Sequence, residues 1–575
     1  DAIRKQSDNR PVEALEDQQR SIALNDYRGV YRSGLLLDQD AASRAASLGR
    51  IFDDLGFEAL ALNTGTAALT EDPGNFAAHR LLADSYATLP RHEIARVSEL
   101  LQAQLLQPLN LTPIQPQLAE SRLGIVSGTG PSDLGLNEFN ELFIQEGIAI
   151  QGNAVVGGDG TLGDDLVVSG LMDTVNLSVG QFHYESDGFR DFNDQDIDIY
   201  TAFLQWVPVP EFSLQLEYRH RDAQSSDLFQ RLDPLDFTDR QESETSRLTR
   251  LGARYSPAPG IDWLATMARE SRDTSYRQPL NLEPPGTVSQ ESRIEGHLGE
   301  FQGRFRRADL ALVAGLGAVN LDRDSEQLFS VFGLGDFPSR NQATERYRNV
   351  YAYLDMDLAP ALTLSLGASG DFYDGPILEQ RQFSPKFGLQ WRPWPGLTLR
   401  GAALRTLFRP NLANQQTLEP VSVAGFNQFF NDPAETESWH YAVGADLVLG
   451  DRLFMGLSLR RRDLDVPFFA PPAGPDQPPT VTIADWQEHL GYAYTYWAPT
   501  DGLALSGEFF FQRFERDERF VNTERFQTLW SRRWKLGARF FDPRGFRAFL
   551  GASYVSQDAH IFQGKGGEDK EIEYE

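Results

Sequence analysis

The sequence contains no cysteine, and this absence removes several classes of site at once. Without thiols the chain forms no disulfide, has no cysteine nucleophile and cannot hold a metal through sulfur ligands. It also lacks any run of about 18 apolar residues, which excludes a transmembrane helix. Basic residues number only 53 against 82 acidic ones, giving a formal net charge of −29. This balance argues against nucleic acid as a partner, because phosphate binding needs basic patches.

Aromatic residues are abundant, at 11% of the 575 residues, with 38 Phe, 18 Tyr and 9 Trp. The mean hydropathy is −0.40, as in many soluble proteins. A membrane β-barrel also averages to a polar composition, because its strands alternate between a lipid face and a wet lumen. Aromatic enrichment suits the interfacial girdles of such a barrel, so the composition leaves both classes open.

The stretch FSLQLEYRHR, residues 212–221, alternates apolar and polar side chains with a period of two, which predicts a β-strand. Leu214 and Leu216 share one face, and Glu217 and Arg219 share the other. In a soluble sandwich the apolar face would cover a core. In a membrane barrel it would face lipid, and the charged face would line a wet lumen.

The same alternation continues from about residue 146 to the end, in about nineteen segments close to the length of a tilted membrane strand. We predict a lipid-facing set comprising Leu214, Leu216, Leu364, Leu366, Leu457 and Leu505. We predict a lumen-facing set comprising Glu217, Arg219, Arg460 and Glu508.

Connection lengths favour the barrel over the sandwich. Tight turns such as VPVPE and RPWPG alternate with long polar segments, as in up-and-down barrels with short periplasmic turns and long outer loops. The predicted long connections are 222–240, 273–288, 321–341, 406–434 and 463–480. Residues 146–575 are therefore predicted to form a transmembrane antiparallel β-barrel in the bacterial outer membrane.

Bacterial single-chain barrels have an even number of strands and no free edge. With about nineteen strands counted, we expect 20–22 in the full protein and an incomplete C-terminus. The closing segment GKGGEDKEIEYE is predicted to be too short to return across the membrane. A separate chain that closes or plugs the barrel is the alternative.

Residues 1–106 are predicted to be helical, because apolar residues recur there at spacings of three and four. Around residues 61–90 the pattern resembles a tetratricopeptide repeat, with Asn75 as a helix cap. An ordinary helical hairpin is the alternative. The residues predicted to pack the repeat are Ala68, Pro73, Ala78, Leu82, Ala83 and Tyr86. Residues 107–145, rich in Pro, Gly and Ser, are interpreted as a linker or a partial lumen segment.

One stretch, FSPKFGLQWRPWPGLTLRGAALRTLFRPNL, resembles the barrel of TonB-dependent receptors. The resemblance rests on Ser384-Pro385, Gly388 and Phe408-Arg409-Pro410, and it implies an outer-membrane barrel without naming a cargo. Such receptors carry a globular plug preceded by a TonB-binding box, and neither is recognisable here. The N-terminal region is predicted to be helical instead.

Candidate sites for chemistry are sparse. The 8 histidines are scattered and form no paired catalytic motif, so we predict that the chain is not an enzyme and has no cofactor. Two acid-rich loops are candidate calcium sites, since calcium prefers oxygen ligands: one holds Asp191, Asp194, Asp196 and Asp198, and the other holds Asp159, Asp164 and Asp165. Solvated surface charge is the alternative interpretation of both loops.

The favoured function is an outer-membrane transport or secretion component, embedded in outer-membrane lipid, whose periplasmic helical domain recruits a protein partner. One alternative is a surface-binding or structural barrel that displays long extracellular loops. Another is a TonB-dependent uptake receptor, which the helical N-terminus makes the less favoured interpretation.

Overall fold

A computed structural model gives the fold of the chain. It describes residues 1–24, 37–114, 146–228, 239–280, 285–307, 309–409, 416–470, 480–516, 526–561 and 570–574. The predicted linker therefore lies outside the described residues from position 115 onward.

The N-terminal region is helical, as predicted. Its helices are α1 (Ala2–Ser7), α2 (Pro11–Ala23), α3 (Leu37–Leu55), α4 (Glu58–Glu71), α5 (Phe76–Ala87) and α6 (Glu93–Leu106). Local sequence sets their ends. Pro11 occupies the first turn of α2, where its missing N–H costs nothing, and the side chain of Asn75 accepts a hydrogen bond from the Ala78 N–H at the start of α5. None of the described helices combines the length and apolar character that a membrane crossing would require.

The remainder of the described chain is almost entirely strand. The first ten are β1 (Gly147–Val156), β2 (Leu162–Met172), β3 (Val175–Ser186), β4 (Gln195–Val209), β5 (Phe212–Ser225), β6 (Gln241–Ala258), β7 (Ile261–Leu280), β8 (Gly286–Arg307), β9 (Leu310–Val331) and β10 (Gly335–Ala359). The next are β11 (Leu362–Asp374), β12 (Glu379–Trp394), β13 (Leu397–Leu407), β14 (Ser422–Val423), β15 (Phe426–Asn427) and β16 (Glu437–Leu449). The last are β17 (Leu453–Ala470), β18 (Thr480–Thr500), β19 (Leu503–Arg516), β20 (Phe526–Phe541), β21 (Arg547–Ile561) and β22 (Lys570–Tyr574).

These strands form one 20-stranded sheet, apart from the small β14–β15 hairpin. Each strand pairs antiparallel with its neighbour in sequence, and β13 pairs with β16 across the hairpin. Within the described residues, β1 and β22 are the edge strands. The closing segment contributes the five-residue strand β22, which pairs with the last five residues of β21.

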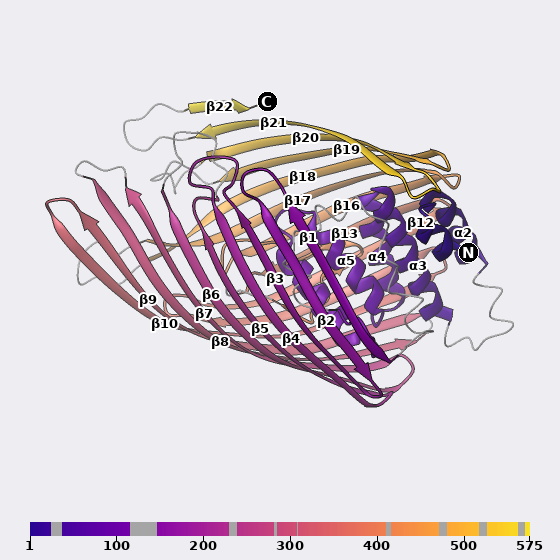
Figure 1. Cartoon of the computed structure of the whole chain (residues 1–575), viewed down its shortest axis with the longest axis horizontal. Coiled ribbons are helices and arrows are strands. Elements are labelled where there is room, and N and C mark those ends of the chain that lie inside the picture. The colour runs from indigo at the N-terminus through magenta and orange to yellow at the C-terminus, as the bar shows by residue number, and fades with distance from the viewer. Residues whose placement is uncertain are drawn as a thin grey trace.

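Two of the predicted long connections are wrong. Residues 273–288 lie mostly in β7 and β8, and residues 321–341 lie mostly in β9 and β10, so these hairpins extend as paired strands well beyond their apolar part (Figure 1). Cross-strand ion pairs such as Arg293–Asp273 and Arg340–Asp324 support the extensions. Polar sequence suggested loops there, but a strand pair outside a membrane needs no apolar face.

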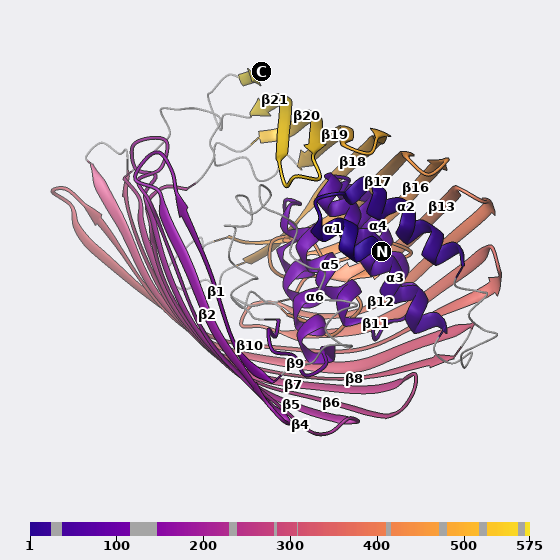
Figure 2. The ribbon, with the colours of Figure 1, turned by 45° about the vertical axis from the view of Figure 1, so that its right-hand side comes forward.

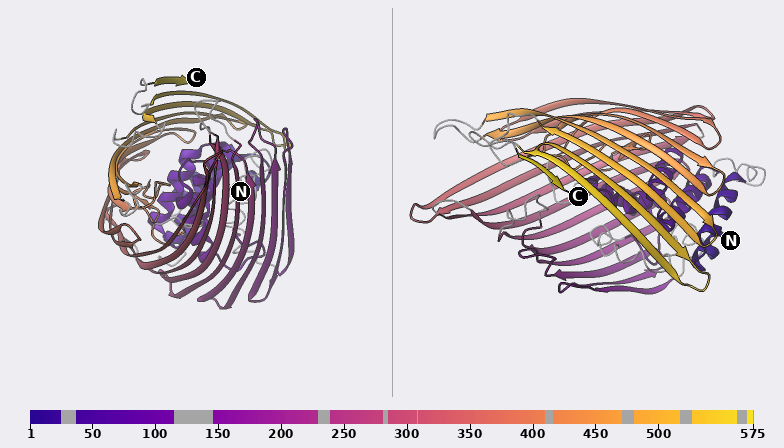
Figure 3. Two further views of the ribbon diagram at one scale, coloured as in Figure 1. Left: turned by 90° about the vertical axis from the view of Figure 1, so that its left-hand side faces the viewer. Right: turned by 90° about the horizontal axis from the view of Figure 1, so that it is seen from above.

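The sheet curls around the helices, which lie inside it at the end where the short turns gather (Figure 2). The view along the lumen shows strands on several sides of the helical bundle (Figure 3). The side-chain amide of Asn9 donates to the carbonyl oxygens of Asp542 and Phe546, in the short turn between β20 and β21. This contact also places the start of the chain at the short-turn end of the barrel. The helices thus occupy the barrel interior instead of forming a separate domain below it.

The tetratricopeptide character is not shown by the structure, which has six short described helices of 6 to 19 residues. Small side chains nevertheless let the helices approach one another closely. Ala68 and Ala78 pack with Ala42, Ala46 and Ala77 in one buried cluster, bringing α3, α4 and α5 close together. Leu82 and Tyr86 belong to a second cluster, in which they pack against Val421, between β13 and β16. Ala83 packs against α6 and Ile114. Pro73 lies in the turn between α4 and α5.

Candidate functional site: the barrel lumen

Two parts of the chain fill the lumen. The first, called the plug here, comprises the described residues 1–24 and 37–114. The second, called the lumen loop, is residues 416–436 between β13 and β16, which includes the β14–β15 hairpin. Both contact the barrel wall through side chains that the alternation of the strands points inward.

One side of the plug is held by aromatic rings. Phe57 stacks on Tyr496 of β18 with ring centroids 4.8 Å apart, and Phe52 meets Phe454 of β17 edge-on at 5.3 Å. These rings belong to a buried cluster that also includes Leu15 and Leu55 of the plug. We call this contact the aromatic anchor. Contacts of this kind stabilise through buried apolar area and ring geometry.

Polar groups border the aromatic anchor on its periplasmic flank. The Lys535 ammonium lies 2.5 Å from the Glu58 carboxylate, at the start of α4. Arg539 donates to the carbonyl oxygens of Asp53 and Asp54, at 3.0 and 3.1 Å, near the end of α3. The Arg539 charge is well placed there, because the C-terminal end of a helix carries partial negative charge.

The opposite side of the plug is held by hydrogen bonds between α6 and the wall formed by β4–β8. Gln215 donates to the carbonyl of Gln104 at 2.7 Å, and Arg254 donates to that of Leu106 at 2.6 Å. Gln205 donates to the carbonyl of Gln107 at 3.2 Å. The last carbonyls of a helix have no partner within it, so wall side chains provide the C-terminal cap of α6.

Arg304 of β8 is the central residue of this polar wall. Its guanidinium donates to the Gln102 side chain at 2.6 Å and to the carbonyl of Pro73, so it contacts both α6 and the α4–α5 turn. Arg306 lies 3.4 Å from Asp72 of the same turn. A small cluster of leucines also packs between α6 and this wall. Its member Leu105 lies against Gly252 of β6, where the Cβ of any other residue would collide with the leucine side chain.

The lumen loop is tied to the wall by a buried carboxylate. Glu419 accepts from Tyr353 at 2.6 Å and from Asn349 at 3.2 Å, and it pairs with Lys386 and Arg409. Arg409 is part of the sequence motif described above. A carboxylate buried to this degree is stable only with such partners, so Glu419 fixes the loop inside the lumen.

The same loop also contacts the plug. The Thr417 N–H donates to the Ser98 hydroxyl at 3.1 Å, and the Asn431 N–H donates to the carbonyl of Arg91 at 3.0 Å. Gly388, another residue of the motif, leaves space for Val423 and Ala424 of the loop. The lumen loop therefore links the plug to the barrel wall.

The predicted lumen residues contact interior groups. Glu217 accepts from Gln104 of α6 and pairs with Arg250, and Arg219 is buried on the same face of β5. Arg460 donates to the carbonyl of Asn427 in the lumen loop at 3.1 Å. Glu508 accepts from Tyr496 at 2.6 Å, directly behind the aromatic anchor.

The predicted lipid-facing leucines lie on the other face of their strands. Leu216, Leu366 and Leu457 are 40–48% exposed, whereas the adjacent Glu217 is 2% exposed. Leu214, Leu364 and Leu505 are half-buried between neighbouring side chains. Contact of this face with lipid remains a prediction.

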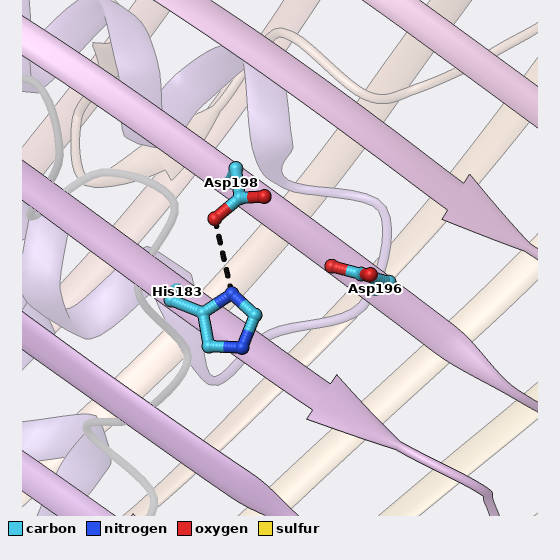
Figure 4. A group of neighbouring side chains, drawn as sticks. All are labelled: His183, Asp196 and Asp198. Carbon is cyan, nitrogen blue, oxygen red and sulfur yellow. Dashed lines mark hydrogen bonds and ion pairs between the residues drawn. The ribbon is translucent and has the colours of Figure 1, made fainter.

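Of the calcium candidates, Asp159, Asp164 and Asp165 do not converge. Asp164 accepts from Gln181 at 2.9 Å, Asp165 accepts from Asn153 at 3.1 Å, and Asp159 lies in the β1–β2 turn. The structure instead brings His183 together with Asp196 and Asp198 (Figure 4). The His183 Nδ1 lies 3.0 Å from Asp198. All three are partly exposed, and a hydrogen-bonded histidine–aspartate pair accounts for the arrangement without a metal ion.

The sequence-based prediction missed the plug location and the lumen loop. One signal was present: α6 carries Glu99, Gln102 and Gln104, yet every residue of α6 after Glu93 is buried. A helix that buries polar and apolar sides alike must meet polar partners on one side and apolar partners on the other.

Solved structures share the fold at low sequence identity. The pyoverdine outer-membrane receptor FpvA from Pseudomonas aeruginosa is 12% identical with a TM-score of 0.51, over 75% of this chain and 74% of that one. The FrpB iron transporter from Neisseria meningitidis is 12% identical with a TM-score of 0.50, over 72% and 75%. In the FpvAI–pyocin S2 complex the chain spans 66% of the matched chain.

A search of curated proteins finds no match. The family description "TonB dependent receptor-like, beta-barrel" matches residues 178–559, which is more than half of the chain. These residues include the motif around Ser384 to Arg409 and all but the first two long strands. The protein therefore belongs to the TonB-dependent receptor-like β-barrel family, in the bacterial outer membrane with its N-terminal region on the periplasmic side.

Proposed function

We propose that the protein is a receptor-type transporter that takes a solute through the barrel lumen, with the helical plug as its gate. The supporting observation is the asymmetric attachment of the plug: aromatic packing on one side and hydrogen bonds on the other. Polar contacts exchange readily with water, so the passage opens between α6 and the β4–β8 wall. The aromatic anchor keeps the plug attached while it does so.

Uptake fits this arrangement better than secretion. The structurally similar FrpB is an iron transporter and FpvA a pyoverdine receptor, and both share this barrel architecture. At 12% identity the likeness concerns the fold, so no cargo is carried over. A TonB-type periplasmic protein is the proposed energy-coupling partner, and it would act on α1 and α2, which contact the periplasmic turns through Asn9 and through the Glu16–Arg452 pair.

A second candidate function is surface binding, and the β9–β10 hairpin favours it. Phe332, Leu334 and Phe337 at its tip are 78%, 68% and 53% exposed, on a stem braced by the Arg340–Asp324 pair. Exposed apolar groups of this kind often mark interaction sites.

Single-channel recording from the full chain in planar bilayers tests the gate. The unaltered protein should remain closed. Replacing Gln102 and Gln104 by Ala together with Arg304 by Gln should produce transient openings, because the polar wall then no longer holds α6. The matched control keeps Gln102→Ala and Arg304→Gln but carries Cys at positions 104 and 215, and joining these two thiols with a short bis-thiol reagent should abolish the openings. Openings unaffected by the link would contradict the proposed passage.

A further inference from the structure

Phe430 of the lumen loop is inserted among three arginines. The guanidinium carbons of Arg462, Arg460 and Arg91 lie 4.0, 5.0 and 5.9 Å from its ring centroid. Arg91 comes from the plug, and the other two come from β17 of the wall. We call these three residues the arginine cage. The loop contributes the ring, whereas the plug and the wall contribute the charge.

The carboxylates around the cage do not balance it. Glu488 of β18 accepts from Arg91 at 2.5 Å and from Arg462 at 2.7 Å. Asp432 of the loop pairs with the same two arginines, at 2.8 Å from Arg91. Among the described residues Arg460 forms no ion pair with a carboxylate: it donates to the Asn427 carbonyl and lies over the rings of Phe426 and Phe430. Without Asp432, three guanidinium groups would share one carboxylate.

Two further observations show positive potential and unused donor capacity at this place. Arg462 is fully buried, and its Nε has no hydrogen-bond partner among the described residues. His92, at the start of α6, packs on Phe430 at 4.8 Å. Burial, with the nearby charges of Arg460, Arg91 and Arg462, lowers the pKa of His92 to about 4. Burial is the larger of these causes, and the three arginine charges act in the same direction.

Arg91 also holds an unusual backbone conformation. Its φ is +63°, in the left-handed region that costs energy for a side-chain-bearing residue. Its carbonyl accepts from Asn431 and its guanidinium binds Asp432, so two adjacent loop residues hold it. Removing the loop would remove the contacts that keep this plug residue in place.

We propose that the arginine cage is a binding site for an organic anion that carries a carboxylate next to an aromatic ring, and that Phe430 and Asp432 occupy it as an internal ligand. An anion of this kind reproduces both groups: its ring covers the guanidinium faces, and its carboxylate pairs with Arg91 and Arg462. Its entry displaces the lumen loop and so frees the plug from the loop. This role in opening rests on the proposed function, whereas the binding site does not.

Benzoate is the probe, because it is the simplest aromatic carboxylate. Calorimetric titration of the full chain in detergent should show weak binding to the unaltered protein, since Asp432 competes for the cage. Asp432→Asn should bind benzoate at least about tenfold more tightly, and Asp432→Asn with Arg460→Gln should lose that gain. The matched control is Asp84→Asn, which removes a carboxylate partner from two plug arginines outside the cage, Arg50 and Arg80, and should bind benzoate no more tightly than the unaltered protein does.

A second measurement keeps the native loop sequence. Val421 of the lumen loop is buried against the plug. Because the native chain has no cysteine, the Val421→Cys variant carries a single thiol, at this position. Benzoate should accelerate its labelling by a maleimide, whereas cyclohexylammonium, a cation of similar size, should not. Equal benzoate affinity in the unaltered and Asp432→Asn proteins, or labelling that benzoate leaves unchanged, overturns the proposal. Neither readout requires transport, so the site can stand if the transport proposal fails.

Discussion

The two sides of the plug are built from different chemistry. The aromatic anchor joins α3 and α4 to β17–β20 through stacked rings, while the polar wall joins α6 to β4–β8 through glutamine and arginine donors. Apolar area that is exposed when the surfaces separate gains nothing in return from water, whereas each hydrogen bond that is lost can be replaced by one to water. The difference indicates which side holds the plug and which side releases it.

The largest effect is expected at the aromatic anchor. Phe57→Ala removes a fully buried ring stacked on Tyr496 and should destabilise plug docking by about 3–5 kcal/mol. The measurement is the urea midpoint at which the helical circular dichroism signal is lost while the barrel stays folded. Phe192→Ala, at an exposed position, is the control and should leave the midpoint unchanged. A small shift for Phe57→Ala would remove the distinction between the two sides.

The outer face of the barrel can be compared with the inner face through two adjacent residues of β17. Leu457→Arg places a charge on the predicted lipid face and should cost about 2–4 kcal/mol of barrel stability near the membrane midplane. Ser458→Arg, one residue on, lies on the other face of β17 at a half-buried position and should cost much less. Folding titrations of both variants in lipid vesicles give the difference, and equal costs would show that the assigned faces are wrong.

On the polar wall, Arg304→Gln removes hydrogen bonds to Gln102 and to the Pro73 carbonyl. The loss should be about 1–3 kcal/mol, less than at Phe57, because water replaces part of what is removed. The same urea midpoint measures it. Arg340→Gln, which breaks an exposed pair with Asp324, is the matched control and should leave the urea midpoint nearly unchanged. A loss at Arg304 exceeding that at Phe57 would reverse the proposed roles.

The smallest effect is expected from pH. Burial raises the pKa of Asp54, at the end of α3, to about 6. The folded plug then binds this proton more tightly than the unfolded chain does, so plug stability should rise as the pH falls from about 7 towards 4. Because the carboxyl keeps some solvent contact and accepts from Gln6, the gain should be modest. Asp54→Asn should flatten the pH dependence of the urea midpoint in this range.

The barrel could be predicted from sequence because strand alternation is a local signal. The period of two around Leu216 and Glu217 reflects one face that avoids water and one that accepts it. The Asn75 cap was equally predictable, since its bond closes within three residues. The hairpins at 273–288 and 321–341 were misjudged because polarity alone does not separate a loop from a paired strand outside the membrane.

The position of the plug was not predictable in the same way. Its contacts join residues far apart in the chain, such as Gln104 with Gln215 and Arg91 with Asp432. Nothing local distinguishes a glutamine that meets water from one that meets a barrel wall. The helices were therefore interpreted as a separate domain, although their polar residues serve as contacts with the lumen.

The central claim, that the N-terminal helices form a plug inside the barrel, is tested most directly by cross-linking in intact outer membranes. Cysteines replacing Gln104 and Gln215 are the only thiols of that variant, because the native chain has none. We predict that a short bis-thiol reagent joins them efficiently, while Gln104→Cys paired with Phe337→Cys at the outer hairpin tip does not react. Failure of the first pair to cross-link, with both thiols shown to be reactive singly, would contradict a plug held in the lumen.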